Sequence, residues 1–174
     1  MRLADFLLDS VFPPRETELI VREASYERLM ESLSPVVRGQ GRQASVSLFS
    51  YADPCAKACI VEAKFEDNMR AAELLGGALY EFLYEFLAEH QSYDVASPFI
   101  IPLPLSADRL RERGYNQTER IVHHALRQSL AATSDTSLLI RTRPTVPQTS
   151  LTGRARQTNV SGAFATTSPC DPYR

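Results

Sequence analysis

Residues 99–119 read FIIPLPLSADRLRERGYNQTE, and this stretch decides the fold that we predict. Three bulky apolar residues at 99–101 are typical of a short strand buried on both faces of a sheet. A proline-rich loop and three arginines follow, and Gly114 then permits a turn with positive φ. Asn116 can cap a helix that begins directly after it, with Glu119 three residues further on, as in a capping box.

The sequence on both sides continues this alternation of strands and helices. Period-two patterns and short apolar runs predict strands at 44–51, 137–140 and 162–166. Helical periodicity predicts helices at 3–11, 16–33, 53–65, 74–87 and 117–131. The pattern at 74–87, with apolar pairs at i, i+1, i+4 and i+5, fits a helix packed on a sheet. A helix face that binds a partner protein would show a similar pattern.

This order predicts an α/β architecture with parallel strands. Residues 36–43 are polar, contain two glycines and are typical of a linker. We therefore expect two parts, a helical N-terminal extension over residues 1–43 and an α/β domain over residues 44–174.

Composition narrows the class of protein. The chain has 174 residues, of which 44% are hydrophobic and 23% charged, as in globular domains that bury a core. Prolines interrupt the apolar stretch 96–107, which is too short to span a membrane. Asp5 and Asp9 cut short the apolar run at the N-terminus, so we expect no secretory signal. These features predict a cytoplasmic protein without membrane insertion.

The cysteines are few and do not suggest a disulfide framework. Cys55, Cys59 and Cys170 form an odd, sparse set, which fits a reducing compartment. Cys55 and Cys59 are four residues apart and can share one face of a helix. Buried structural thiols and half of a metal site both explain this spacing.

Charge is distributed unevenly along the chain. Residues 1–100 have a net charge of −7, whereas residues 101–174 contain ten arginines, five acidic residues and a net charge of +5. The planar donor fork of arginine suits phosphate, so this second part either faces an anion or forms a solvated basic surface.

The stretch after the first buried strand is a candidate anion site. Ligands of open α/β sheets bind beyond the carboxyl ends of the strands, where a helix N-terminus offers free N–H groups. Arg109 and Arg113 are four residues apart and can share a side, while Arg111 points elsewhere. The stretch is therefore either a pyrophosphate cradle or a charged loop before a well-capped helix.

Residues 141–164 form a second polar stretch with two prolines and several arginines. It contains too few apolar residues for a core segment, and long polar loops in compact domains are usually functional or disordered. Such a loop can close over a phosphorylated substrate and exclude water, or it can contact single-stranded nucleic acid. Tyr115 is the only aromatic residue near enough in sequence to stack on a base.

Together these stretches resemble the ComF family, the competence-type or GntX-like phosphoribosyltransferase-like proteins. The motifs that carry the resemblance are PLPL at 102–105, RERGYNQ at 111–117, RTRPTVPQ at 141–148, RQTNV at 156–160 and GAF at 162–164, with weaker support from FSY at 49–51 and AKF at 63–65. The resemblance covers about residues 44–166. The joint occurrence of the two arginine-rich stretches makes it specific.

The resemblance implies a type I phosphoribosyltransferase-like fold, a Rossmann-like parallel sheet flanked by helices. It implies that phosphoribosyl pyrophosphate (PRPP) or a nucleotide is the ligand, with Mg²⁺ on the pyrophosphate. The residues implied to meet the pyrophosphate are Arg109, Arg113, Gly114, Asn116 and Gln117. Those implied to form a mobile hood over the site are Arg141, Arg143, Gln148, Arg156 and Asn159.

Two departures from the family change the expectation. Phe12-Pro13-Pro14 matches the family, but no cysteines of a zinc module follow it, so we expect no zinc and a helical replacement. The acidic pair and the Thr-Thr-Gly loop that bind the ribose and its 5′-phosphate do not follow residue 166. We therefore expect a C-terminally incomplete domain that is inactive as it stands, and we assign no catalytic residue and no protein metal ligand.

Three hypotheses about function stay open. The first is a glycosyltransferase of nucleotide metabolism, cut short, whose parent transfers phosphoribosyl groups and is linked to competence and DNA uptake. The second is a non-catalytic module of DNA uptake that binds nucleotides, single-stranded DNA or competence proteins. The third is a decayed chain without activity of its own. The acceptor base and the oligomeric state are not predicted.

Overall fold

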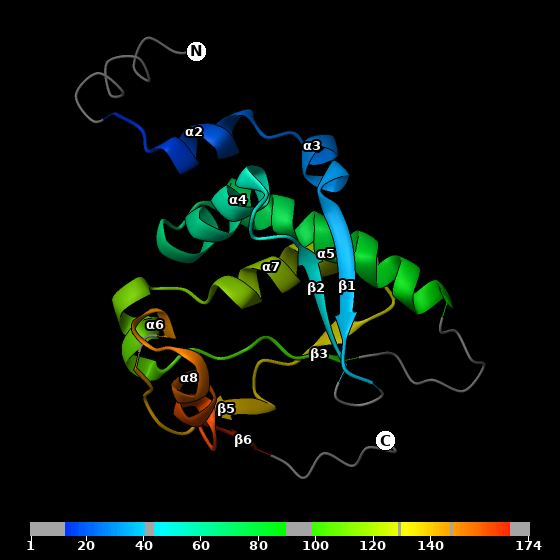
Figure 1. Cartoon of the computed structure of the whole chain (residues 1–174). Coiled ribbons are helices and arrows are strands. Elements are labelled where there is room, and N and C mark those ends of the chain that lie inside the picture. Colours follow the sequence, from blue (N-terminus) through cyan, green and yellow to red (C-terminus); the bar gives the residue numbers. More distant parts are fainter. Residues whose placement is uncertain (1–12, 41–43, 90–98, 129, 147, 168–174) are drawn as a thin grey trace. The chain divides into compact units, whose positions relative to one another are not determined.

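The computed structural model describes residues 13–40, 44–89, 99–128, 130–146 and 148–167 (Figure 1). The chain forms two compact units, Met1–Phe82 and Leu83–Arg174. Helix α5 (Met69–Glu89) begins in the first unit and ends in the second. The helix predicted at 3–11 lies outside the described residues. The domain boundary predicted after residue 43 falls within the first unit, next to residues that are not described, and stays a prediction.

The first unit combines helices with a two-stranded ribbon. Its helices are α2 (Glu16–Glu23), α3 (Tyr26–Glu31), α4 (Pro54–Phe65) and most of α5, and its strands are β1 (Leu33–Arg38) and β2 (Ser45–Phe49). The two strands lie side by side (Figure 1). They pair antiparallel, with Val37 opposite Val46. We predicted a linker at residues 36–43. Its first residues, 36–38, instead belong to β1, so that part of the prediction was wrong. β-branched Val36 and Val37 favour an extended backbone, and cross-strand pairing with β2 stabilises it.

The predicted helix 16–33 is divided into α2 and α3. Ala24 is extended at ψ 124°, and Ser25 accepts a hydrogen bond from Arg28 N at 3.1 Å through its side chain. A serine hydroxyl that caps a new helix competes with continuation of the preceding one, which explains the break. The predictions at 44–51, 53–65 and 74–87 are confirmed by β2, α4 and α5.

The core of the first unit is built mainly from small side chains on α4 and α5. These include the fully buried Ala56, Cys59, Ala71 and Ala78, and α2 and α3 add the buried Val21 and Leu29. Small residues let helix backbones approach closely. A Cβ atom added to Gly77 would lie 2.6 Å from Cε2 of Tyr26. Cys55 is also buried, and burial raises the pKa of the Cys59 thiol to about 12, which agrees with structural thiols.

The second unit contains short strands and three further helices. Its elements are β3 (Phe99–Ile100), α6 (Ala107–Arg113), α7 (Gln117–Leu126), β4 (Thr133–Ser134), β5 (Leu139–Arg141), the 3₁₀ turn η2 (Gln148–Ser150), α8 (Gly153–Val160) and β6 (Phe164–Thr166). β3 and β4 pair parallel, whereas β5 and β6 pair antiparallel. The chain is thus α/β, with seven α-helices and three two-stranded sheets among the described residues.

The strand at 99–101 is less buried than predicted. Phe99 is 62% exposed and Ile101 is 40% exposed. An apolar run shows that a strand can be buried but does not show what covers it, and here the paired strand β4 consists of exposed Thr133 and Ser134. The predicted strands at 137–140 and 162–166 are present as β5 and β6, but they are not parallel. No helix in the described part of the chain is long and apolar enough to span a membrane.

Candidate anion-binding site

The arginine-rich part of residues 99–119 is a helix rather than the loop that we predicted. Ser106 begins α6 by accepting a hydrogen bond from Arg109 N at 3.4 Å, and Gly114 ends it in the left-handed conformation at φ 77°. The sequence between these caps consists largely of good helix formers, which explains the helix. The predicted positive φ at Gly114 is confirmed.

The three arginines of α6 have different surroundings. Arg111 is highly exposed, forms an ion pair with Asp108 and donates from Nε to Ala107 O. Arg113 donates from Nη1 to Gln117 Oε1 at 3.4 Å. The guanidinium of Arg109 is half-buried and forms neither a hydrogen bond nor an ion pair with any residue that the structure describes. Arg109 therefore has the greatest capacity of the three for a ligand.

Asn116 caps α7, as predicted, and its side chain is fully used in doing so. Oδ1 accepts from Thr118 N at 3.1 Å, while Nδ2 donates to Leu103 O at 3.1 Å and to Glu119 Oε1 at 2.9 Å. The residue is 4% exposed. These bonds join the proline-rich loop to the start of α7, so Asn116 shapes the site and has no donor left for an anion.

Tyr115 is not available as a stacking platform. The residue is 7% exposed, and the Arg120 guanidinium lies over its ring at 4.1 Å from the ring centre. A buried ring that already stacks on a cation cannot receive a base on that face.

Residues 142–162 contain more regular structure than the polar loop that we predicted. The segment leaves β5 and returns to β6, and its base is closed by the pairing of Arg141 with Phe164 and by Thr142 N donating to Ala163 O at 3.0 Å. Between these ends lie η2 and α8. None of the α8 residues is buried.

Most of the predicted hood residues bind the backbone of this same segment. Arg143 Nη2 donates to Asn159 O at 3.1 Å and to Ser161 O at 2.7 Å. The side chain of Asn159 accepts from Val146 N at 3.2 Å and donates to Val146 O at 2.9 Å. These bonds hold residues 143–146 against the end of α8.

Gln148 and Arg156 contribute in the same way. Gln148 Nε2 donates to Arg156 O at 3.5 Å, and Arg156 Nε donates to Leu151 O at 2.7 Å. Four of the five predicted hood residues thus stabilise the shape of the segment, a role that their polarity alone does not reveal.

Arg141 differs from the other hood residues. It is half-buried, donates from Nη2 to Thr145 Oγ1, and lies with its guanidinium 5.5 Å from the centre of the Phe164 ring. Its Nε is buried and has no hydrogen-bond partner in the described part of the chain. Burial, and then the positive charges of Arg109 and Arg143, lower the pKa of Arg141.

We call Arg109, Arg141 and Arg143 the arginine cluster. The positive charges of Arg109 and Arg143 act on Arg141, and none of the three forms an ion pair with a carboxylate that the structure describes. The sequence analysis assigned Arg109 to the pyrophosphate and the other two to a hood. Their proximity comes from the fold, since 32 residues separate Arg109 from Arg141. Such a cluster can bind a multiply charged anion.

Mg²⁺, which the resemblance implies, does not fit the donors of this cluster. Mg²⁺ requires oxygen ligands in octahedral geometry, whereas guanidinium groups are cationic and only donate hydrogen bonds. Thr145 Oγ1 already accepts from Arg141. Among the described residues, no group of three or more His, Cys, Asp or Glu side chains could hold a metal ion.

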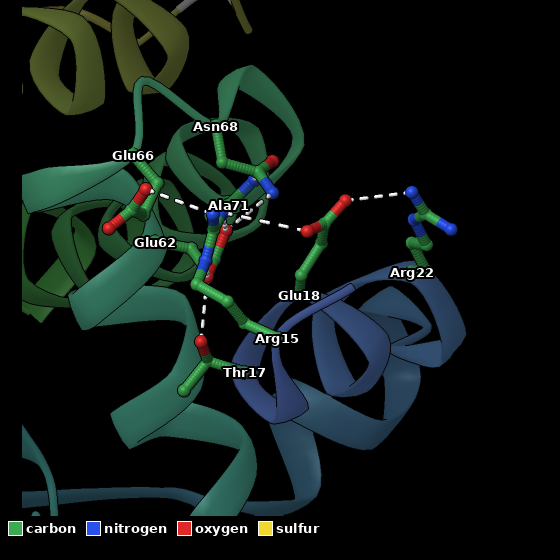
Figure 2. Close-up of polar contacts among 8 residues, drawn as sticks. All are labelled: Arg15, Thr17, Glu18, Arg22, Glu62, Glu66, Asn68 and Ala71. Carbon is green, nitrogen blue, oxygen red and sulfur yellow. Dashed lines mark hydrogen bonds and ion pairs between the residues drawn. The ribbon is translucent and has the colours of Figure 1, made fainter. Parts of the chain in front are cut away.

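A second polar cluster, which the sequence analysis missed, surrounds Glu62 in the first unit (Figure 2). Glu62 is fully buried; its carboxylate accepts from Arg15 Nε and Nη2, both at 3.3 Å, from Thr17 Oγ1 at 2.6 Å and from Asn68 Nδ2 at 3.2 Å. Burial by itself raises the pKa of Glu62, but the bonds from these three residues outweigh it and hold the pKa below its usual value. A buried carboxylate with every lone pair used is a structural group rather than an acid or base catalyst.

Comparison with models of protein families, with curated proteins and with solved structures found no match to this chain. Its function is therefore inferred from the geometry and charge of the arginine cluster.

Proposed function

We propose that the arginine cluster binds the pyrophosphate of PRPP or of a nucleotide, in a ComF-like phosphoribosyltransferase-family protein with a type I fold that serves competence and DNA uptake. The observation that carries the anion site is the environment of Arg141. Its guanidinium is partly removed from water, has two like-charged neighbours and lacks a carboxylate partner among the described residues. Such an arrangement is unfavourable by itself, and a bound anion offsets both the desolvation and the repulsion.

The residues of the site divide into those that contact the anion and those that position them. Arg109 and Arg141 come from α6 and β5 and supply the direct contacts. Arg143 adds charge while its Nη2 is held by the backbone of the segment 142–162. Arg113, beside the left-handed turn at Gly114, is a further candidate contact. Asn116, Gln117, Gln148, Arg156 and Asn159 keep the two arginine-bearing segments in shape.

Binding, rather than phosphoribosyl transfer, is the function that these residues support. Guanidinium groups can stabilise a departing pyrophosphate while positive charge develops on the ribose carbon. Transfer also requires the ribose and the acceptor to be positioned, and that demands contacts beyond a pyrophosphate site. No described side chain in the cluster is a general base.

Isothermal titration calorimetry with inorganic pyrophosphate and with PRPP tests the proposal. Arg109→Gln removes a charge without breaking any hydrogen bond of its guanidinium, and we expect about tenfold weaker binding, as for the loss of one charge-assisted contact. Arg111→Gln is the matched control, because it lies on the same helix but is exposed and paired with Asp108. Equal binding by the wild type and Arg109→Gln would contradict the proposal.

A second candidate function is binding of single-stranded DNA along the same surface. Helix α8 supports it, because this exposed helix carries Arg154 and Arg156 and no acidic residue. Backbone-driven binding releases counterions, so affinity for an oligonucleotide should fall steeply with added salt. Tight oligonucleotide binding that pyrophosphate does not displace would favour this candidate over the first.

A further inference from the structure

The arginine cluster carries positive charge that no described carboxylate neutralises. The pKa of Arg141 is lowered by burial, by Arg109 and by Arg143, and no carboxylate is among the groups that act on it. Asp108, the acidic residue next to Arg109 in sequence, is paired with Arg111. The cluster thus presents positive charge that its own described surroundings do not neutralise.

Several oxygen atoms beside the cluster accept hydrogen bonds from its guanidinium groups. Thr145 Oγ1 accepts from Arg141, and the carbonyl oxygens of Asn159 and Ser161 accept from Arg143. A metal ion that arrives on a phosphate ligand would have to share these oxygen atoms with the guanidinium groups that already donate to them. It would also bring two positive charges close to three guanidinium groups, which repel it.

We propose that this site selects a metal-free polyanion, such as uncomplexed pyrophosphate or the terminal phosphates of a metal-free nucleotide. Mg²⁺ then acts as a competitor for the ligand rather than as a cofactor. The proposal rests on the proposed function of the cluster as an anion site, and it reverses the expectation that the family resemblance gives for the metal. The physical reason is charge: coordination by Mg²⁺ removes two of the negative charges that the guanidinium groups recognise.

The test is a calorimetric titration of inorganic pyrophosphate into the full chain, once in buffer with a chelator and once with saturating Mg²⁺. Sodium chloride equalises the ionic strength of the two buffers, because screening alone weakens binding. We expect the dissociation constant to rise about tenfold in Mg²⁺, as expected for the loss of two ligand charges at a partly exposed site. Equal or tighter binding in Mg²⁺ would overturn the preference for a metal-free ligand but would leave the proposed anion site in place. No binding in either buffer would overturn both proposals.

Arg109→Gln shows whether the effect of Mg²⁺ arises at the cluster. With one guanidinium fewer, free pyrophosphate loses more affinity than its magnesium complex does, so the ratio of the two dissociation constants should move toward one. Arg111→Gln should keep the wild-type ratio, because its guanidinium is paired with Asp108. An unchanged ratio in Arg109→Gln would show that Mg²⁺ acts elsewhere, and the proposal would be wrong.

Discussion

Arg15 donates two hydrogen bonds to Glu62, from Nε to Oε1 and from Nη2 to Oε2, both at 3.3 Å (Figure 2). The residues are 47 positions apart, and the pair fixes the backbone just before α2 against the last turn of α4. At the other end of α2, Arg70 of α5 donates to the carbonyl oxygens of Val21 and Ala24. Two arginine contacts therefore hold both ends of α2 in the first unit.

Arg15→Met should lower the free energy of unfolding by about 2 kcal/mol, because it removes charge-assisted hydrogen bonds from a buried carboxylate. Urea denaturation measures the change. Arg111→Met is the control, since Arg111 pairs with Asp108 at the exposed surface of α6, where such a pair contributes about 0.3–0.5 kcal/mol. Equal losses in the two variants would contradict a special role for the Glu62 cluster.

The pKa of Glu62 predicts how stability changes with pH. Its pKa is lower in the folded chain than the ordinary value of 4.5, so its contribution is present above that value and is lost as the pH falls through the folded pKa. Glu62→Gln should therefore flatten the acid side of the stability curve relative to the wild type. Unfolding in urea at pH 7, 5 and 3 measures the difference, and parallel curves for the two proteins would contradict it.

Gly77→Ala should destabilise the chain by about 1–2 kcal/mol, although alanine is the better helix former. The new Cβ would lie 2.6 Å from Cε2 of Tyr26, whose hydroxyl is held by Glu81 at 2.8 Å, so the ring cannot move away freely. Combining it with Tyr26→Leu in a double-mutant cycle should recover part of the loss, as measured by thermal unfolding. Strict additivity of the two changes would rule out the clash.

Asn116→Ala should reduce stability by about 1–2 kcal/mol through loss of the α7 cap. Affinity for pyrophosphate, measured well below the unfolding temperature, should stay within about twofold, because the Asn116 side chain is already saturated by Leu103, Thr118 and Glu119. A large loss of affinity in a stably folded variant would restore Asn116 to the anion-binding residues.

The sequence was sufficient to predict those elements that depend on residues close together in the chain. The apolar pairs of α5, the start of α4 at residue 53 or 54, the Asn116 cap of α7 and the positive φ of Gly114 were all predicted and are all observed. Each depends on hydrogen bonds or side-chain spacing within a few positions, which a sequence displays directly. The family resemblance also implied that Arg109 meets the pyrophosphate and that Arg141 belongs to the hood, and these assignments stay predictions.

Contacts between distant segments decided the rest. The exposure of Phe99, the antiparallel pairing of β5 with β6, the strand β1 and the Arg15–Glu62 pair all depend on which distant segment lies alongside. The same holds for the site. Composition marks Arg141, Arg143, Gln148, Arg156 and Asn159 as one polar group, but the fold turns four of them toward their own backbone and places Arg141 near Arg109. Hydrogen-bond partners and like-charge repulsion act through space, so only the tertiary structure separates the four residues that bind the backbone of the segment from Arg141, on which Arg109 and Arg143 act.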